Sequence, residues 1–236
     1  MRQLPLAVRL DDAALFSTYH AGPNAEAVAF LRRVLDVPGP VAWLRGPAAS
    51  GKTHLLQATC AATPGSAYLP ADDLLCLEPA VLDGWEERSL VCLDDVDRLA
   101  GRDDWEVALF GLFNRLSEAG RRLVVSGQSA PSASGFRLPD LASRLAWGAV
   151  FRLQPLGDED KLRALQLRAA HRGLDLPEDT GRYLLRRLPR DMAQLCGWLD
   201  RLDTASLAAQ KRLTIPFVRE VLAAYPPSAV RNSEPA

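Results

Sequence analysis

The sequence predicts an α/β domain, with a five-stranded parallel sheet between layers of helices, followed by a small all-α domain. Short apolar runs alternate with helical patterns up to about residue 153, which is typical of parallel sheets covered on both faces. Beyond residue 157 the pattern is purely helical. A chain of 236 residues with 48% hydrophobic content can form a sizeable α/β core and a second, smaller one.

The elements follow in order along the chain. Apolar runs predict strands at 41–44, 67–69, 90–93, 123–126 and 149–153. The first helix, 25–35, follows the turn-forming sequence Gly22-Pro23-Asn24. A helix at 105–119 has large apolar residues on one face, and another is expected at 138–145. Amphipathic stretches in the last part predict helices at 158–172, 178–188, 191–205 and 214–223.

The clearest chemical signal is the segment 46–53, which reads GPAASGKT and matches G-x-x-x-x-G-K-[ST] in full. A strand precedes it and a helical stretch follows it, so a glycine-rich turn without phosphate chemistry is the weaker interpretation. Glycines let backbone N–H groups turn toward phosphates, Lys52 supplies a cation and the Thr53 hydroxyl can ligate Mg²⁺. We expect the phosphates of a bound nucleotide to lie at Gly46, Ser50, Gly51, Lys52, Thr53 and His54.

Two acids, Asp94 and Asp95, end the apolar run 90–93. In open α/β sheets, ligands bind beyond the carboxyl ends of the strands. Asp94 is therefore expected to hold the Mg²⁺ shell, and Asp95 to orient or deprotonate water. An Asp-rich turn without chemistry is the alternative, which the nearby phosphate-binding loop disfavours.

Composition narrows the function further. A net charge of −1 argues against a protein that coats DNA through bulk charge. The four cysteines are widely separated and form no C-x-x-C pair, which predicts reduced, buried thiols in a cytoplasmic protein. The three histidines show no metal-ligand spacing. We expect neither a signal peptide nor a membrane-spanning segment, since no apolar stretch is long enough to span a bilayer.

A phosphate-loop sheet followed by a helical lid is the layout of AAA+ proteins, and several segments resemble particular members. The segment 138–145, LPDLASRL, resembles the one that bears the arginine finger in the bacterial replication initiator DnaA and its relatives. The segment 16–19, FSTY, with Gly22 and Asn24, resembles their nucleotide-base segment. The stretches 158–169 and 211–218 resemble the lid of the Hda family, regulators that inactivate DnaA.

This resemblance, which covers nearly the whole chain, implies roles for further residues. Arg144 would be an arginine finger acting in trans on ATP held by DnaA, and such fingers are worth about a thousandfold or more in rate. The alternative is an arginine that pairs with an acid at a helix end, for instance Asp140. Tyr19 and Asn24 would contact the nucleotide base.

The amino terminus resembles the short motif by which the Hda family docks on the sliding clamp of DNA polymerase III. In the sequence Gln3-Leu4-Pro5-Leu6, Gln3 would be a polar anchor and Leu4 and Leu6 would fill a groove, while Pro5 lowers the entropy lost on ordering. Without the resemblance, these residues would suggest only a tail that packs on the domain. The further helix-turn-helix domain of DnaA has no counterpart in this sequence, so sequence-specific origin binding is not expected.

Two positions depart from the AAA+ pattern. Gln128 stands where the family usually places an acid or amide that polarises the attacking water, and glutamine cannot act as a base. Ala193 stands where relatives carry a lid arginine, and Arg190, three residues earlier, is expected to reach from the same helical face. The loss of a lid cation favours bound ADP and argues against efficient ATP hydrolysis by the chain itself.

The expected organisation is a clamp-binding tail at 1–10, an AAA+ nucleotide-binding domain at 11–155, a helical lid at 156–225 and a disordered tail at 226–236. The expected function is that of a cytoplasmic AAA+ regulator. Docked on the DNA-loaded clamp, at the nucleoid, it stimulates hydrolysis of DnaA-bound ATP and so represses replication initiation. DNA would be contacted mainly through the clamp, and a homodimer remains open.

Two other functions stay open at this point. One is a self-contained P-loop ATPase or loader that uses Asp95 as its base. The other is a DNA-binding AAA+ protein with a phosphate-contacting stripe formed by Arg186, Arg187 and Arg190, although arginine-rich helix surfaces are usually only solvated.

Overall fold

The computed structural model describes residues 14–37 and 40–225. The chain divides into two compact units, Met1–Pro155 and Leu156–Ala236. The expected clamp-binding residues Gln3, Leu4 and Leu6 and the expected tail 226–236 lie outside the described residues. No described helix is both long and apolar enough to cross a membrane.

A parallel sheet forms the centre of the first unit, in the strand order β2-β3-β4-β1-β5. The parallel α/β fold class is therefore as predicted. In the pairing register, Arg45 lies opposite Gly127 and Pro70 lies opposite Asp94, so β1, β2, β3 and β4 end at the same edge. The strands are β1 (Val41–Arg45), β2 (Ala67–Pro70), β3 (Leu90–Asp94), β4 (Arg122–Gly127) and β5 (Ala149–Arg152).

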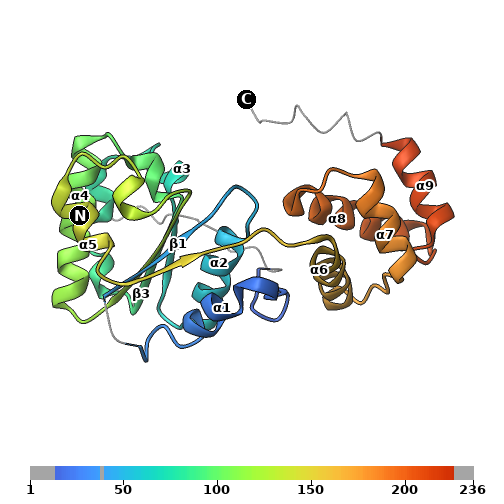
Figure 1. The fold of residues 1–236 in the computed structure, drawn as a ribbon, viewed down its shortest axis with the longest axis horizontal. Coiled ribbons are helices and arrows are strands. Elements are labelled where there is room, and N and C mark those ends of the chain that lie inside the picture. Colours follow the sequence, from blue (N-terminus) through green and yellow to red (C-terminus); the bar gives the residue numbers. More distant parts are fainter. Residues whose placement is uncertain (1–13, 38–39, 226–236) are drawn as a thin grey trace. The chain divides into compact units, whose positions relative to one another are not determined.

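Helices cover both faces of this sheet (Figure 1). Successive strand residues alternate between two cores, so Ala42 and Leu44 pack with the helices α1 and α2, whereas Val41 and Trp43 pack with α4 and α5. The near-continuous apolar strands of the sequence follow from this double cover. The helices are α1 (Ala25–Leu31), α2 (Lys52–Ala62), the short α3 (Ala71–Leu74), α4 (Asp103–Glu118) and α5 (Pro139–Leu145).

The second unit is all-helical in its described residues. Its core contains Leu165, Trp198, Leu199 and Val218. Ion pairs join its helices at the surface, and one of them links Arg172 to Asp200 at 2.6 Å. The four expected helices are present as α6 (Asp158–His171), α7 (Glu178–Arg187), α8 (Met192–Ala209) and α9 (Ile215–Ala224).

Two local expectations are wrong. α1 ends at Leu31 rather than near residue 35, because the N–H groups of Arg33 and Val34 bond to carbonyls three residues back, the tighter spacing with which helices often end. Cys76 is exposed in the turn after α3, whereas Cys60 and Cys92 are buried thiols as predicted.

A buried carboxylate fixes the segment that leads into α5. Glu106 on α4 is only 1% exposed. It accepts hydrogen bonds from the backbone N–H groups of Gly101 at 2.7 Å, Arg137 at 2.8 Å and Leu138 at 2.7 Å. Because Leu138 is the residue at which α5 is capped, Glu106 ties the start of α5 to α4.

Replacing Glu106 with Gln should destabilise the first unit. One carboxylate oxygen becomes an NH₂ group that faces backbone donors, so at least one buried N–H loses its acceptor. The free energy of unfolding should fall by about 2 kcal/mol, as is usual for a lost charge-assisted bond. Urea unfolding measures this, with Glu118→Gln at the exposed end of α4 as the control. An unchanged midpoint for Glu106→Gln would mean that other contacts hold the segment.

Candidate nucleotide-binding site

The phosphate-binding loop lies between β1 and α2, where the sequence predicts it. Ala49 and Gly51 adopt left-handed backbone conformations, with φ values of 57° and 94°. Right-handed and left-handed residues in succession gather backbone N–H groups into a concave, anion-attracting nest. Helix α2 begins at Lys52, so the positive end of its dipole adjoins the same loop.

The glycines of this loop have no room for a side chain. A Cβ on Gly46 would lie 2.8 Å from Ser50 Oγ, and one on Gly51 would lie 2.9 Å from the ring of Tyr19. Ser50 Oγ is buried and has no hydrogen-bond partner within the part of the chain that the structure describes. These features fit a loop whose backbone cradles a phosphate chain.

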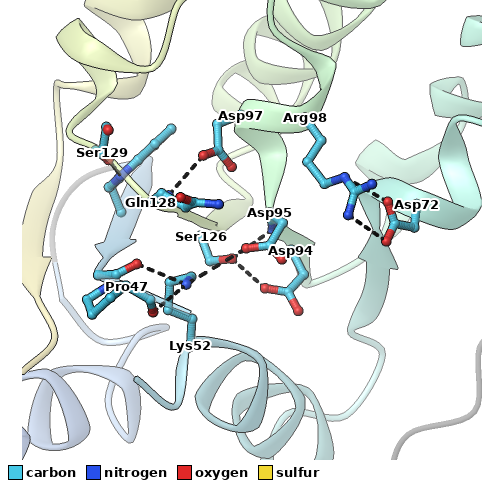
Figure 2. A network of polar contacts seen from close by, with 12 residues as sticks. Pro47, Lys52, Asp72, Asp94, Asp95, Asp97, Arg98, Ser126, Gln128 and Ser129 are labelled. Atoms are coloured by element: carbon cyan, nitrogen blue, oxygen red, sulfur yellow. Dashed lines mark hydrogen bonds and ion pairs between the residues drawn. The ribbon is translucent and has the colours of Figure 1, made fainter. Parts of the chain in front are cut away.

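Lys52 supplies the cation of this loop (Figure 2). Its Nζ donates to the carbonyl oxygens of Gly46 at 3.0 Å and Pro47 at 3.1 Å, and lies 3.9 Å from Asp95 Oδ1. The Lys52 side chain is 6% exposed, whereas that of Asp95 is 44% exposed. The ammonium group therefore stands between the loop and the acid that follows β3.

Asp94, the first of the two acids, is buried and held by hydroxyl groups from both neighbouring strands. Tyr68 on β2 donates to Asp94 Oδ2 at 2.7 Å, and Ser126 on β4 donates to Oδ1. Ser126 Oγ also accepts the backbone N–H of Asp95 at 2.8 Å. Burial, together with the nearby charge of Asp94, raises the pKa of Tyr68, so this hydroxyl remains a protonated donor. The carboxylate is thereby fixed in orientation.

Asp95, the second acid, has a strained backbone and a perturbed carboxyl group. Its φ of 49° is left-handed. Burial and then the charge of Asp94 raise the pKa of Asp95, while Lys52 opposes this effect. A carboxyl group with a raised pKa is a better proton acceptor, which suits a general base.

Gln128 follows the end of β4 and lies close to these acids (Figure 2). Its backbone N–H donates to Asp97 Oδ2 at 3.0 Å. Because a glutamine side chain does not accept a proton at neutral pH, it can orient water there but not activate it as a base.

The residues expected to bind Mg²⁺ supply suitable oxygen ligands. Thr53 is exposed in the first turn of α2, and Asp94 is fixed at the end of β3. Among the described residues, no group of three or more His, Cys, Asp or Glu side chains could hold a metal ion. Mg²⁺ at this site would need phosphate oxygens and water as further ligands, as is usual for nucleotide-bound Mg²⁺.

The segment expected to contact the base is tied to the rest of the unit by its own side chains. Asn24 Nδ2 donates to Gln154 O at 3.0 Å, and Asn24 Oδ1 accepts the N–H of Gln154 at 2.8 Å. Tyr19 packs edge-on against His54, with ring centroids 5.1 Å apart. Burial raises the pKa of Tyr19 to about 12, so it is neutral at physiological pH. Asn24 thus positions this segment, because both ends of its amide are already paired.

Arg144 stands in the last turn of α5 and is held by aromatic rings. Its guanidinium carbon lies 4.1 Å from the ring centroid of Trp147 and 6.0 Å from that of Phe113. No ion pair of this guanidinium, with Asp140 or any other acid, occurs in the described structure. The helix-end pairing considered from the sequence is therefore not what holds Arg144.

Known proteins resemble both units. Residues 158–222 match a family model described as the lid domain of Hda. Domain III of DnaA from Thermotoga maritima superposes with a TM-score of 0.79 and 21% identity, over 92% of this chain and 99% of that one. Residues 158–222 therefore resemble the lid of Hda, and the chain has the fold of DnaA domain III.

Two further structures share the fold. DnaA from Aquifex aeolicus, solved with bound AMPPCP, has a TM-score of 0.66 and 19% identity, over 83% of this chain and 66% of that one. The Holliday junction branch migration motor RuvB of Thermotoga maritima has a TM-score of 0.63 and 13% identity, over 87% of this chain and 68% of that one. Both support the α/β AAA+ architecture.

In the second unit, one site expectation needs correction. Helix α8 begins at Met192, and Asp191 is its N-cap, whose carboxylate accepts the N–H of Ala193 at 2.7 Å. Arg190 therefore precedes the helix and does not share a helical face with Ala193. Its Nη1 instead lies 3.4 Å from Asp158 Oδ2, and both side chains are exposed. The supposed arginine stripe is partly engaged, since Arg190 is paired with this acid.

Asp95→Asn tests the environment of this acid. Since folding raises the pKa of Asp95, ionisation of its carboxyl costs stability above that raised pKa, whereas below the ordinary aspartate value of about 3.9 the cost vanishes. Asparagine, which also tolerates left-handed φ, should raise the melting temperature at pH 7 without nucleotide. The gain should shrink as the pH falls through the raised pKa.

Thermal unfolding between pH 4 and pH 8 measures this gain, with exposed Asp73→Asn as the matched control. A gain of equal size at every pH would assign the effect to backbone preference alone.

Proposed function

We propose that this AAA+ protein binds ADP or ATP with Mg²⁺, docks on the polymerase sliding clamp and stimulates hydrolysis of ATP held by DnaA. By converting DnaA to its ADP form, it would repress replication initiation. The observation that carries this proposal is the placement of Arg144, a cation that no carboxylate pairs among the described residues and that is remote from the chain's own phosphate-binding loop.

The distance between these two cations follows from the sheet. The loop that contains Lys52 follows the last residue of β1, Arg45. Gly148, four residues after Arg144, packs against the carbonyl of Val41, the first residue of β1. Five residues of extended chain span about 13 Å, so Arg144 belongs to the opposite edge of the sheet. A guanidinium there suits a phosphate bound by another subunit.

The partners are inferred from likeness. The Hda-type lid and the DnaA-like fold favour a role in DnaA regulation in the cytoplasm. The motif that contains Gln3, Leu4 and Leu6 favours clamp docking, through which the protein would reach DNA. The residues of the phosphate-binding loop fit a nucleotide, and AMPPCP is bound by the related fold of DnaA.

One observation favours a competing function. The raised pKa of Asp95, close to Lys52, is what a self-contained ATPase would need in a general base. The two mechanisms place the essential residue at opposite edges of one sheet, so single substitutions can separate them.

Lys52→Ala should abolish the stabilisation of the protein by nucleotide. In wild type, ADP with Mg²⁺ at a hundredfold excess over its Kd should raise the free energy of unfolding by about 2.7 kcal/mol. Without the Lys52 cation this gain should approach zero. Thermal shift measures it, with exposed Lys211→Ala as the charge-matched control. No shift in wild type at millimolar ADP would contradict nucleotide binding.

Arg144→Ala should retain ADP binding and clamp docking but reduce stimulation of DnaA-bound ATP hydrolysis by about a thousandfold. Arg144→Lys should behave nearly like alanine, because an ammonium group lacks the planar fork that spans two phosphate oxygens. The measurement is conversion of ATP–DnaA to ADP–DnaA in the presence of clamp loaded on DNA.

Three variants serve as comparisons in this assay. Arg137→Ala, in an exposed ion pair with Asp103 just before α5, should leave stimulation intact. Asp95→Asn should also leave it intact, whereas alanine at Gln3, Leu4 and Leu6 together should remove its dependence on the clamp. Loss of stimulation in Asp95→Asn together with full stimulation in Arg144→Ala would favour the self-contained ATPase.

A further inference from the structure

We propose that Trp147 is a positioning residue for Arg144. Its ring contacts the flat face of the Arg144 guanidinium, so that the N–H edges remain open for a phosphate. The effect of Trp147 on DnaA-bound ATP rests on the proposed function. The contact itself is a property of this chain alone and can be tested without any partner.

The contact has two components. The guanidinium carbon of Arg144 lies 4.1 Å from the centroid of the Trp147 ring, well inside the range of a cation–π interaction, for which tryptophan is the best aromatic partner. The backbone N–H of Trp147 also donates to the backbone carbonyl of Arg144 at 3.1 Å. Backbone and side chain therefore keep the two residues in one fixed relation.

The indole ring is itself anchored from the core. Phe113, which is 1% exposed, meets the Trp147 ring edge-on, with centroids 6.1 Å apart and an interplanar angle of 82°. After Trp147, the chain passes so close to β1 that a Cβ on Gly148 would lie 1.6 Å from Val41 O. The Trp147 ring is thus held by Phe113, and the backbone that follows it is held against β1.

This arrangement differs from that of the arginines that carboxylates hold. Arg182 donates to Glu159 and Glu178, and Arg115 donates to Glu86, so carboxylates occupy the N–H groups of both. Arg144 is held through its π face instead, which uses none of its five donors. A planar fork with free donors is what bidentate binding of phosphate oxygens requires.

Exposure of Trp147 supports the same role. The residue is 58% exposed, although a tryptophan is among the largest apolar side chains and gains most from burial. A ring kept at the surface, beside a cation that no acid pairs in the described part of the chain, makes sense if it holds that cation where a second protein can reach it.

The first test uses nuclear magnetic resonance of the isolated protein. The Nε–H signal of Arg144, identified by its disappearance in Arg144→Lys, should be shifted upfield by the ring current of Trp147. Trp147→Leu should return it to the position of solvent-exposed arginines, whereas Trp147→Tyr should keep part of the shift. An unshifted wild-type signal, or one unchanged in Trp147→Leu, would overturn the proposal.

The second test is the DnaA assay with the same variants. Trp147→Leu should lower the maximal stimulated rate about three- to tenfold, as expected for loss of one cation–π contact. The concentration for half-maximal stimulation should stay constant, and Trp147→Tyr should restore most of the rate. Trp85→Leu is the matched control, because Trp85 lies under Arg88, with 5.7 Å between the guanidinium carbon and the ring centroid.

The two hypotheses fail in different ways. A higher concentration for half-maximal stimulation, with an unchanged maximal rate, would indicate that Trp147 contacts the partner. This result would overturn its positioning role. No stimulation by wild type would overturn the proposed function, and the Nε–H shift would then decide alone whether Trp147 positions Arg144.

Discussion

Parallel pairing of β3 with β4 places a serine hydroxyl between two consecutive acids, and the candidate nucleotide site depends on this alignment. Ser126 donates to Asp94 and accepts the N–H of Asp95, although it lies 32 residues after Asp94 and 31 residues after Asp95 along the chain. Tyr68 from β2 completes the support of Asp94. A one-residue slip of either strand would turn these side chains to the other face of the sheet, so the site requires this register.

Local features of this fold could be predicted, whereas tertiary support could not. The phosphate-binding loop and each strand are formed by contiguous residues. A motif and an apolar pattern are therefore enough to predict them. Glu106, Ser126 and Tyr68 were missed because their value lies in donors and acceptors that only the folded chain brings together. The sequence does contain a signal for Ser126. It is a polar residue at the end of the apolar run 123–126, and the apolar run of the neighbouring strand also ends in polar residues, Asp94 and Asp95. Arg190 was misplaced because Asp191 caps α8 after it.

Glu106 extends the same logic to the other functional candidate. Its buried carboxylate holds the backbone of Arg137 and Leu138, and so fixes where α5 begins. Arg144 lies near the end of that short helix, and its guanidinium packs on the ring of Trp147. This ring contacts Phe113 of α4 in turn. Contacts with α4 therefore fix both ends of α5. Under the proposed function, Arg144 must meet a phosphate in another protein and needs such rigidity, because a displacement of about 1 Å can cost a hundredfold in rate.

The two candidate functional cations of the first unit, Lys52 and Arg144, have different surroundings. Lys52 is surrounded by loop carbonyls and Asp95, so its charge is already compensated within the chain. Arg144 is half-buried, yet none of the described carboxylates pairs with it, and the Trp147 ring offsets only part of the lost hydration. Under the proposed function, a partner's phosphate would supply the missing charge in a site from which water is excluded, where the attraction is stronger than at an exposed surface. An arginine already paired with an acid would first have to break that pair, and much of its contribution to the transition state would be lost.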